Sequence, residues 1–182
     1  MNKILPDVAD AAVEIVPYDK AWPAMFEAER ASLQAALAPW LTGDIEHVGS
    51  TAIPGLVAKP IIDIMAPVAE LKTSIAAIEA VKILGYVYHP YKSEVMHWFC
   101  KPSPHLRTHH LHLVPRDSSL WKEQLIFRDA LRQNRALFAE YAALKLRLSQ
   151  EFRLDREAYT AAKEPFIVSV LSQFSGSGQG AI

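Results

Sequence analysis

Hydrophobic residues are spaced in two different ways along the chain, and this spacing predicts where strands and helices lie. Short apolar runs bounded by Gly, Pro or polar residues predict strands, whereas apolar residues that recur every three or four positions predict helices. Strands are expected over residues 12–16, 45–48, 60–68, 86–89, 95–101 and 108–114. The run 60–68 is apolar on both faces, so we expect it to be a central strand.

Helices are expected between the early strands and throughout the last third of the chain. They cover residues 19–38, 71–84, 118–150 and 155–174. Pro39 ends the first of these helices and Gly85 the second, since neither residue continues a helix well. Asn134 is suited to cap a new helix within 118–150, and Pro165 predicts an interruption of the last helix.

This order of elements predicts an α+β fold with a mixed sheet of about five to six strands. Helices flank the sheet, and the C-terminal third is helical. The elements do not follow a regular strand–helix–strand alternation, so short turns are expected to join the later strands. We expect one domain over residues 1–174 and a flexible Gly- and Ser-rich tail over 175–182.

Composition is typical of a soluble globular protein. The chain has 182 residues, of which 51% are hydrophobic and 21% charged, with a formal net charge of −1. Without a basic excess, broad nucleic-acid binding is not expected, and no apolar run is long enough to span a membrane. Asp7 and Asp10 interrupt the region where a signal peptide needs an apolar core. Because Cys100 is the single cysteine, we expect a cytoplasmic protein.

A glycine-serine turn and a strand carboxylate form the main candidate site. Gly49 lets the backbone approach a ligand closely, and Ser50 and Thr51 add hydroxyl groups to backbone N–H groups that can hold phosphate oxygens. Asp63 lies in an otherwise apolar strand, where an ionised carboxylate needs a charged partner, hydrogen bonds or a metal. Together with Lys59, these residues predict a site for phosphate and metal.

A purely structural role for the same residues is the competing interpretation. In that case the Gly-Ser pair forms only a turn, and Asp63 pairs with Lys59 or with an arginine to hold the sheet together. A Walker-type phosphate loop is excluded, because the chain contains no Gly-Lys-Ser/Thr sequence.

Histidines are concentrated near one expected strand, since five of the seven fall between His97 and His112. His110 and His112 share one face of that strand, and His109 lies on the opposite face. If the strand neighbours the one that carries Asp63, then Asp63, His110 and His112 form a set of ligands that favours a transition metal. The alternative is that these histidines are hydrogen-bonded polar groups of the core.

Charged residues elsewhere supply further candidates. Arg128 is expected to bind phosphate, because a guanidinium fork matches phosphate oxygens, with a surface ion pair to Asp129 as the alternative. We expect Glu46 to pair with Lys59. Two residues of the last helix either close over the pocket or only pack their helix, and these are Tyr159 and Lys163.

Several longer motifs carry a resemblance to a known family. They are HVGSTAIPGL at 47–56, KPIIDI at 59–64, HLHL at 110–113, FRD at 127–129, YAALK at 141–145 and DREAY at 155–159. In these motifs the sequence resembles the GrpB family, and the likeness extends over nearly the whole chain, from Val16 to about Leu171.

The resemblance implies a fold similar to the nucleotidyltransferase superfamily, the polymerase-β-like group. In that group a Gly-Ser turn precedes a strand with two carboxylates one residue apart, and a third carboxylate on a later strand completes a site for two divalent metals. Gly49 and Ser50 match the turn, and Asp63 matches the first carboxylate. Met65 stands at the second carboxylate position, where a thioether is a poor ligand for Mg²⁺, and His112 is expected near the third.

Two functions remain as alternatives. One is an enzyme of nucleotidyl or phosphoryl transfer with Asp63 and His112 as catalytic residues and with Mg²⁺, Mn²⁺ or a transition metal at the histidine cluster. The other is a non-catalytic module that has lost the two-metal site. Both would bind a nucleotide or another phosphorylated metabolite. GrpB domains fused to dephospho-coenzyme A kinase imply a link to coenzyme A metabolism.

Overall fold

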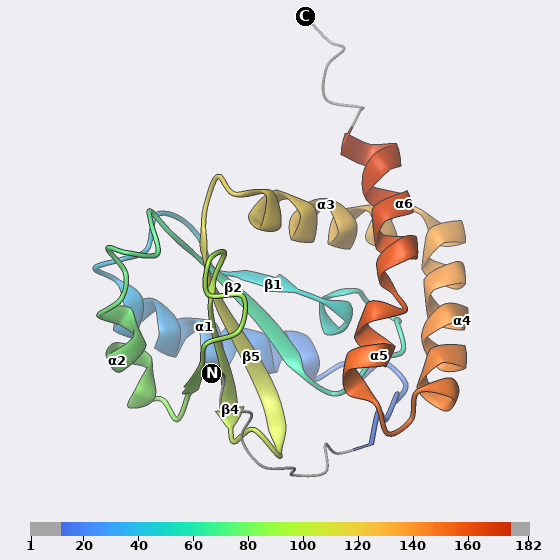
Figure 1. Ribbon diagram of the computed structural model, residues 1–182, viewed down its shortest axis with the longest axis horizontal. Helices are drawn as coiled ribbons and strands as arrows, with labels where there is room; N and C mark the ends of the chain where they lie inside the picture. Colours follow the sequence, from blue (N-terminus) through green and yellow to red (C-terminus); the bar gives the residue numbers. More distant parts are fainter. Residues whose placement is uncertain (1–11, 176–182) are drawn as a thin grey trace, which may run out of the picture.

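The computed structural model describes residues 12–175, which form one open sheet and the helices around it (Figure 1). The strands are β1 (Glu46–Val48), β2 (Ile62–Val68), β3 (Val87–His89), β4 (His97–Pro102) and β5 (Arg107–Pro115). The helices are α1 (Trp22–Leu37), α2 (Ala77–Lys82), α3 (Ser119–Gln133), α4 (Arg135–Glu151), α5 (Arg156–Ala161) and α6 (Glu164–Ser175), with a short 3-10 turn η1 (Ser50–Ala52). The predictions for residues 1–11 and 176–182 lie outside the described residues.

The sheet has the strand order β1-β2-β5-β4-β3. β2 and β5 are parallel, and the other neighbouring strands are antiparallel. In the parallel pair, Asp63 lies opposite His110 and Met65 lies opposite His112. The mixed α+β sheet is therefore confirmed, and the histidine strand does neighbour the Asp63 strand.

The two faces of the sheet have different surroundings. On one face, residues such as Ile62, Ile64 and Leu111 form the main core with α1 and α2. On the other face, Met65 packs in a smaller apolar cluster that includes Trp121 of α3. Met65 therefore points away from Ile62 and Ile64, as the alternation of side chains along a strand requires.

The N-terminal segment 12–16 does not form a strand of the sheet, so that prediction is wrong. Val16 makes an isolated antiparallel bridge with Ala58, closed by backbone hydrogen bonds of 2.8 and 3.0 Å. Pro17 follows directly and has no N–H to extend a ladder of hydrogen bonds. The pairing therefore stops after one bridge.

The helix expected over 71–84 is shorter in the structure, because α2 covers only Ala77–Lys82. The hydroxyl of Ser74 donates to the carbonyl oxygens of Glu70 and Leu71, at 2.9 and 3.1 Å. Such bonds from a side chain compete with the regular hydrogen bonds of a helix. The segment before Ala77 therefore forms turns.

The C-terminal helices follow the prediction closely. The Asn134 side chain accepts hydrogen bonds from the backbone N–H groups of Ala136 and Leu137, so α4 begins where a cap was expected. The last helix is interrupted as predicted, with Pro165 in the first turn of α6. Figure 1 shows α4, α5 and α6 grouped on one side of the sheet. No helix of the described residues is long and apolar enough to cross a membrane.

Candidate functional site

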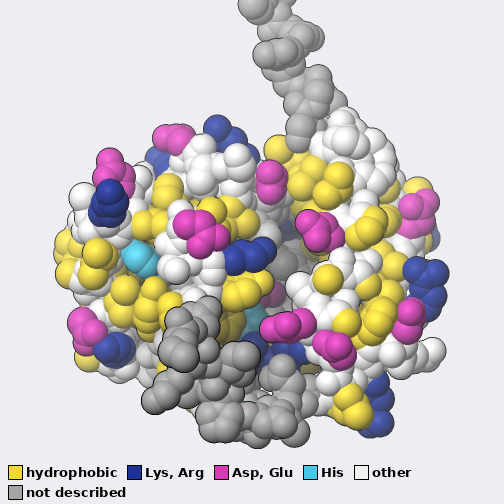
Figure 2. All heavy atoms as spheres, in the orientation of Figure 1, with side chains coloured by type: hydrophobic (Ala, Val, Ile, Leu, Met, Phe, Trp, Pro, Cys, Tyr) yellow, Lys and Arg dark blue, Asp and Glu magenta, His cyan; other side chains and the backbone are white. Residues whose placement is uncertain are grey.

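A cavity of about 330 Å³ has walls from both the sheet region and the C-terminal helices. The residues from the sheet side include Gly49, Ser50, Thr51, Lys59, Asp63 and His110, and those from the helical side include Tyr141, Lys145, Tyr159 and Lys163. Figure 2 shows the surface hollowed between the part built on the sheet and the part built from α4, α5 and α6. The cavity therefore gathers most of the residues predicted to bind a ligand.

Gly49 allows the turn to lie directly against the Asp63 carboxylate. Its backbone has φ +69° and ψ −169°, a conformation that is open almost only to glycine. A Cβ atom at this position would also collide with Oδ2 of Asp63. The structure thus gives two separate reasons for glycine in the predicted Gly-Ser turn.

Thr51 holds the turn in place from within the protein. Its hydroxyl donates to the carbonyl oxygen of Ile61 at 3.0 Å, and its Oγ1 lies 3.0 Å from Nε2 of His47. Burial lowers the pKa of His47 to about 4, so the neutral ring can donate its Nε2–H to Thr51. The hydroxyl proton of Thr51 is therefore already used, which leaves Ser50 as the better placed donor to a ligand.

Asp63 and His110 form a hydrogen-bonded pair in the cavity wall, with 2.9 Å between Asp63 Oδ1 and His110 Nδ1. Burial raises the pKa of Asp63, but the hydrogen bond from His110 and the nearby His112 ring outweigh burial and hold the pKa well below its ordinary value. Burial also lowers the pKa of His110, against the attraction of Asp63. The pair is therefore an ionised carboxylate and a neutral imidazole that donates Nδ1–H.

This tautomer leaves the second ring nitrogen of His110 with a lone pair. Nε2 is buried and has no hydrogen-bond partner among the described residues. A buried acceptor without a partner is unfavourable unless a proton donor or a metal fills the place. His110 is thus suited either to take a proton or to bind a metal.

His112 lies near the same carboxylate, two residue pairs further along the strands. Its Nε2 is 4.0 Å from Asp63 Oδ1, and its Nδ1 is 3.3 Å from the sulfur of Met96. Asp63, His110 and His112 each offer one ligand atom, and these atoms lie within 4.8 Å of one another. One carboxylate oxygen and two imidazole nitrogens are a donor set that suits a transition metal better than Mg²⁺.

Met65 does not offer a place for a second carboxylate. Its side chain is only 1% exposed and packs with Val48, Met96, Val114 and Trp121. Mg²⁺ requires oxygen ligands, and an apolar cluster supplies none. The residues present therefore do not fit the pair of Mg²⁺ ions implied by the nucleotidyltransferase resemblance.

Three lysines from different parts of the chain meet at the cavity. The ammonium groups of Lys59 and Lys163 lie over the ring of Tyr159, at 5.2 and 4.3 Å from its centre. Lys145 is 2% exposed, and its Nζ donates to the carbonyl oxygen of Val57 at 2.6 Å. These three amino groups outnumber the two carboxylates that line the cavity among the described residues, Asp63 and Glu123, so the cavity is suited to an anion.

Burial and the repulsion of neighbouring lysines shift Lys163 and Lys145 toward their neutral form. Burial first, and then the charge of Lys59, lower the pKa of Lys163 to about 8, although Asp63 opposes the change. Burial, with the charges of Lys163 and Lys59, lowers the pKa of Lys145 well below its ordinary value. A bound anion would favour protonation of both amines, because an opposite charge stabilises the charged form.

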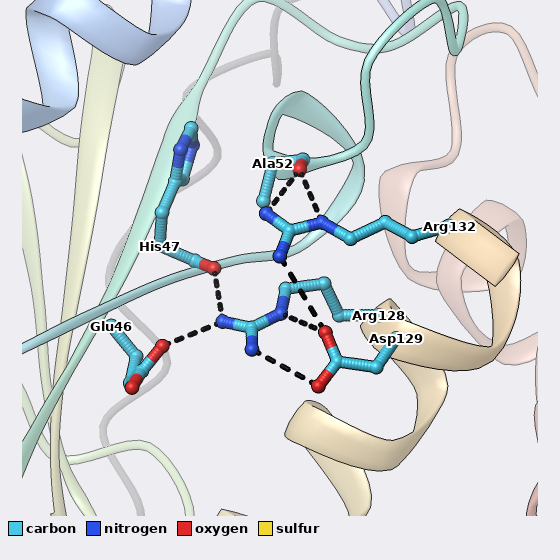
Figure 3. A network of polar contacts seen from close by, with 6 residues as sticks. All are labelled: Glu46, His47, Ala52, Arg128, Asp129 and Arg132. Atoms are coloured by element: carbon cyan, nitrogen blue, oxygen red, sulfur yellow. Dashed lines mark hydrogen bonds and ion pairs between the residues drawn. The ribbon is translucent and has the colours of Figure 1, made fainter.

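Two arginines of α3 hold the Gly-Ser turn from the side away from the cavity (Figure 3). Arg128 donates to the carbonyl oxygen of His47 at 3.0 Å. Arg132 donates twice to the carbonyl oxygen of Ala52, at 3.1 and 2.7 Å. These two carbonyl groups flank residues 49–51, so the arginines fix both ends of the turn.

Arg128 forms the ion pair with Asp129 that was its alternative prediction, and it also pairs with Glu46. It pairs with Glu46 at 2.6 Å and with Asp129 at 2.8 Å, so Glu46 has a different partner from the expected Lys59. Arg128 lines a second cavity, together with Arg132, rather than the cavity that contains Asp63. Arg128 thus holds one end of the Gly-Ser turn, and its predicted contact with phosphate stays a prediction.

Some site residues could not be identified from sequence. Lys145 lies in the motif 141–145, and a lysine on a helix gives no indication of burial until the packing of that helix is known. Arg132 shares a helix with Arg128 at a spacing of four residues, which places both on one face. That spacing is the one available signal for its role.

Comparisons with known proteins agree on one family. A family model described as GrpB protein matches residues 12–173. A UPF0157 protein of Pseudomonas aeruginosa is 38% identical over 172 residues, which are 90% of this chain and 68% of that protein. The glutamate-rich protein GrpB of Alkalihalophilus pseudofirmus is 34% identical, with 88% of this chain and 95% of the relative covered.

A solved structure and one enzyme extend these similarities. The crystal structure of conserved protein GrpB from Enterococcus faecalis matches with a TM-score of 0.79 and 31% identity, covering 88% of this chain and 96% of that chain. A dephospho-CoA kinase of Mycolicibacterium paratuberculosis is 29% identical over a match that covers 87% of this chain. The match covers only 45% of that kinase.

Proposed function

The chain belongs to the GrpB family, and on the basis of its lysine-rich cavity we propose that it binds a nucleotide or another phosphorylated metabolite. The observation that carries this proposal is the meeting of Lys59, Lys145 and Lys163 with the Gly-Ser turn around one cavity. Backbone N–H groups near such a turn and lysine ammonium groups are both suited to phosphate oxygens.

The proposed roles follow from the contacts of each residue. Ser50 and the backbone of the turn hold phosphate oxygens, while Lys59 and Lys163 neutralise their charge. Lys145 is almost fully buried and donates to the carbonyl oxygen of Val57, so it supports the wall of the cavity. Thr51 keeps the turn in shape through its bonds to Ile61 and His47.

Asp63 and His110 form a hydrogen-bonded pair in the cavity wall and are suited to a catalytic role. Asp63 fixes the imidazole tautomer, so Nε2 of His110 can accept a proton. We also propose that one divalent transition metal can be held by Asp63, His110 and His112, in which case it would replace the proton between Nδ1 of His110 and Asp63. Such an ion would act as a Lewis acid toward a phosphoryl oxygen. Nucleotidyl or phosphoryl transfer is the activity this arrangement supports, with Asp63 and His112 as catalytic residues.

The buried Met65 favours a second candidate, a binding module without transfer chemistry. An apolar cluster replaces the second carboxylate, so the two-metal mechanism of the nucleotidyltransferase group has lost one of its ligands. The similarity to part of a dephospho-CoA kinase supports a phosphorylated ligand from coenzyme A metabolism for either candidate.

A panel of ligands and metals separates these candidates. Melting temperature is measured with nucleotides and coenzyme A precursors, alone and with Mg²⁺, Mn²⁺ or Zn²⁺, and any stabilising ligand is then tested for turnover. Stabilisation that needs a transition metal, with turnover lost in Asp63→Asn, supports the enzyme, whereas stabilisation without metal or turnover supports the module. If no phosphorylated compound raises the melting temperature under any condition, the proposed function is wrong.

A further inference from the structure

One wall of the cavity changes from charged to apolar along a single helical face. Lys163, Ile167 and Leu171 all line the cavity and follow one another at intervals of four residues. The N–H of Ile167 donates to the carbonyl oxygen of Lys163 at 3.1 Å, so Lys163 continues directly into α6. Residues spaced by four lie one above another on a helix, and these three therefore form a continuous stripe.

The α3 side of the cavity offers no further lysine or arginine. Glu123, Gln124 and Phe127 line it from α3. The Phe127 ring packs edge-on against Tyr141 at 5.2 Å and against Phe166 at 6.4 Å, which fixes its position. A ligand between α3 and α6 would thus meet Phe127, Ile167 and Leu171, with the polar side chains of Glu123 and Gln124 beside them.

The distance between the lysines and the apolar residues of the stripe determines which shape of ligand fits the cavity. With a rise of about 1.5 Å per residue, Lys163 and Leu171 are roughly 12 Å apart along the helix axis. The lysines that suit a phosphate lie at one end of this stripe, and Leu171 lies at the other. Inorganic phosphate would fill the charged end and leave the apolar stripe unused.

We propose that the ligand is an organic phosphate ester with an elongated, largely apolar body that lies along Ile167 and Leu171. The inference rests on the proposed function, because it places the phosphate group at Lys59 and Lys163. The α6 stripe then selects the body of the ligand, while the Gly-Ser turn and the lysines select its phosphate.

A series of n-alkyl phosphates tests this inference by isothermal titration calorimetry. Methyl, butyl and hexyl phosphate carry the same phosphate group and differ only in apolar length. The dissociation constant is expected to fall along the series, by about two- to fourfold per methylene that becomes buried. Equal affinity for methyl and hexyl phosphate would overturn the inference and leave the proposed function intact. Failure of every member to bind would instead contradict the proposed function.

Substitutions on α6 test whether Ile167 and Leu171 contact the alkyl chain of the ligand. Leu171→Ser and Ile167→Ser are each expected to remove most of the gain from methyl to hexyl phosphate while leaving methyl phosphate binding unchanged. Val168→Ser is the matched control, because Val168 is 56% exposed on the same helix and does not line the cavity. The inference is overturned if both cavity variants keep the full increase in affinity from methyl to hexyl phosphate. It is also overturned if Val168→Ser loses as much of that increase as the cavity variants do.

Discussion

Glycine at position 49 combines an unusual backbone conformation with a close contact to the Asp63 carboxylate. The structure contains a useful comparison at Gly85, which also has a positive φ, +84°, but whose added Cβ would lie at an ordinary 3.9 Å from the Lys101 side chain. Substitution of each glycine by alanine therefore separates backbone strain from the collision.

We expect Gly49→Ala to lower the free energy of unfolding by more than Gly85→Ala does. Strain alone accounts for about 1–3 kcal/mol at a position of this kind, and the displaced carboxylate adds to it only at Gly49. Urea denaturation of both variants measures the difference. Equal losses would show that the turn does not depend on the contact with Asp63.

The lowered pKa of Lys163 predicts that phosphate binding depends on pH. Below about pH 8 the amine is protonated and attracts the anion, and above that pH it becomes neutral. Since the second pKa of a phosphate ester is about 6, the ligand charge changes little between pH 7 and 9. The dissociation constant of methyl phosphate should therefore rise about tenfold over this range, by the linkage between proton and ligand binding.

Lys163→Met serves as the control for this pH dependence. Its affinity should be weaker than that of the wild type at pH 7 and should change much less between pH 7 and 9. Calorimetry at several pH values gives both curves. A wild-type affinity that does not fall above pH 8 would show that Lys163 does not carry the charge that binds phosphate.

The positions of some site residues could be predicted from the sequence, and those of others could not. Asp63, His110 and His112 were predicted to meet if their two strands were neighbours, because strand alternation fixes which side chains share a face. The pairing of β2 with β5 in the structure meets that condition. Lys145 lies on a helix that sequence does not orient. The actual partner of Glu46 likewise depends on how α3 packs against β1, which no local pattern determines.

At the level of elements, α3 supports the turn through two arginines at a spacing of four residues. The carbonyl groups that they hold lie before and after residues 49–51, and Asp129 contacts both guanidinium groups, at 2.8 and 3.5 Å. A loop held at both ends loses less conformational entropy when a ligand binds. The position of α3 is therefore part of the site, although neither arginine lines the cavity.

We predict that Arg132→Met weakens methyl phosphate binding by about tenfold, because hydrogen bonds to charged groups contribute about 1.5–3 kcal/mol and two are lost at Ala52. The melting temperature should fall only modestly, since the Arg132 side chain is 38% exposed. Arg135→Met, at an exposed residue of the neighbouring helix, is the control and should leave binding unchanged. Unchanged binding in Arg132→Met would show that the turn keeps its shape without this support.

Elements were predicted well where one local signal dominated. The caps at Asn134 and Asp155 and the proline at 165 fixed the breaks between the C-terminal helices, because each acts on the backbone next to it. Segment 12–16 has the composition of a strand, but pairing stops at Pro17. The segment before α2 has helical spacing, but Thr73 and Ser74 hydrogen-bond the backbone instead. In both cases a local hydrogen-bonding constraint outweighed the hydrophobic pattern.

For the whole molecule, the order of elements along the sequence predicted the mixed sheet, but it did not predict the cavity. Its walls come from the turn after β1, from β2 and β5, and from all the helices after β5. The packing of the C-terminal helices against the sheet creates the cavity, and sequence periodicity does not specify that packing. The family resemblance identified the Gly-Ser turn, while the three lysines became one site only in the folded structure.

The position of a bound phosphate analogue tests the central claim most directly. Crystals soaked in tungstate, a tetrahedral oxyanion with a strong anomalous signal, would show where the protein binds such a group. We predict that the strongest anomalous peak lies in the cavity among Ser50, Lys59 and Lys163, and that this peak is lost in Lys163→Met. Peaks found only outside this cavity would contradict its assignment as the phosphate-binding site.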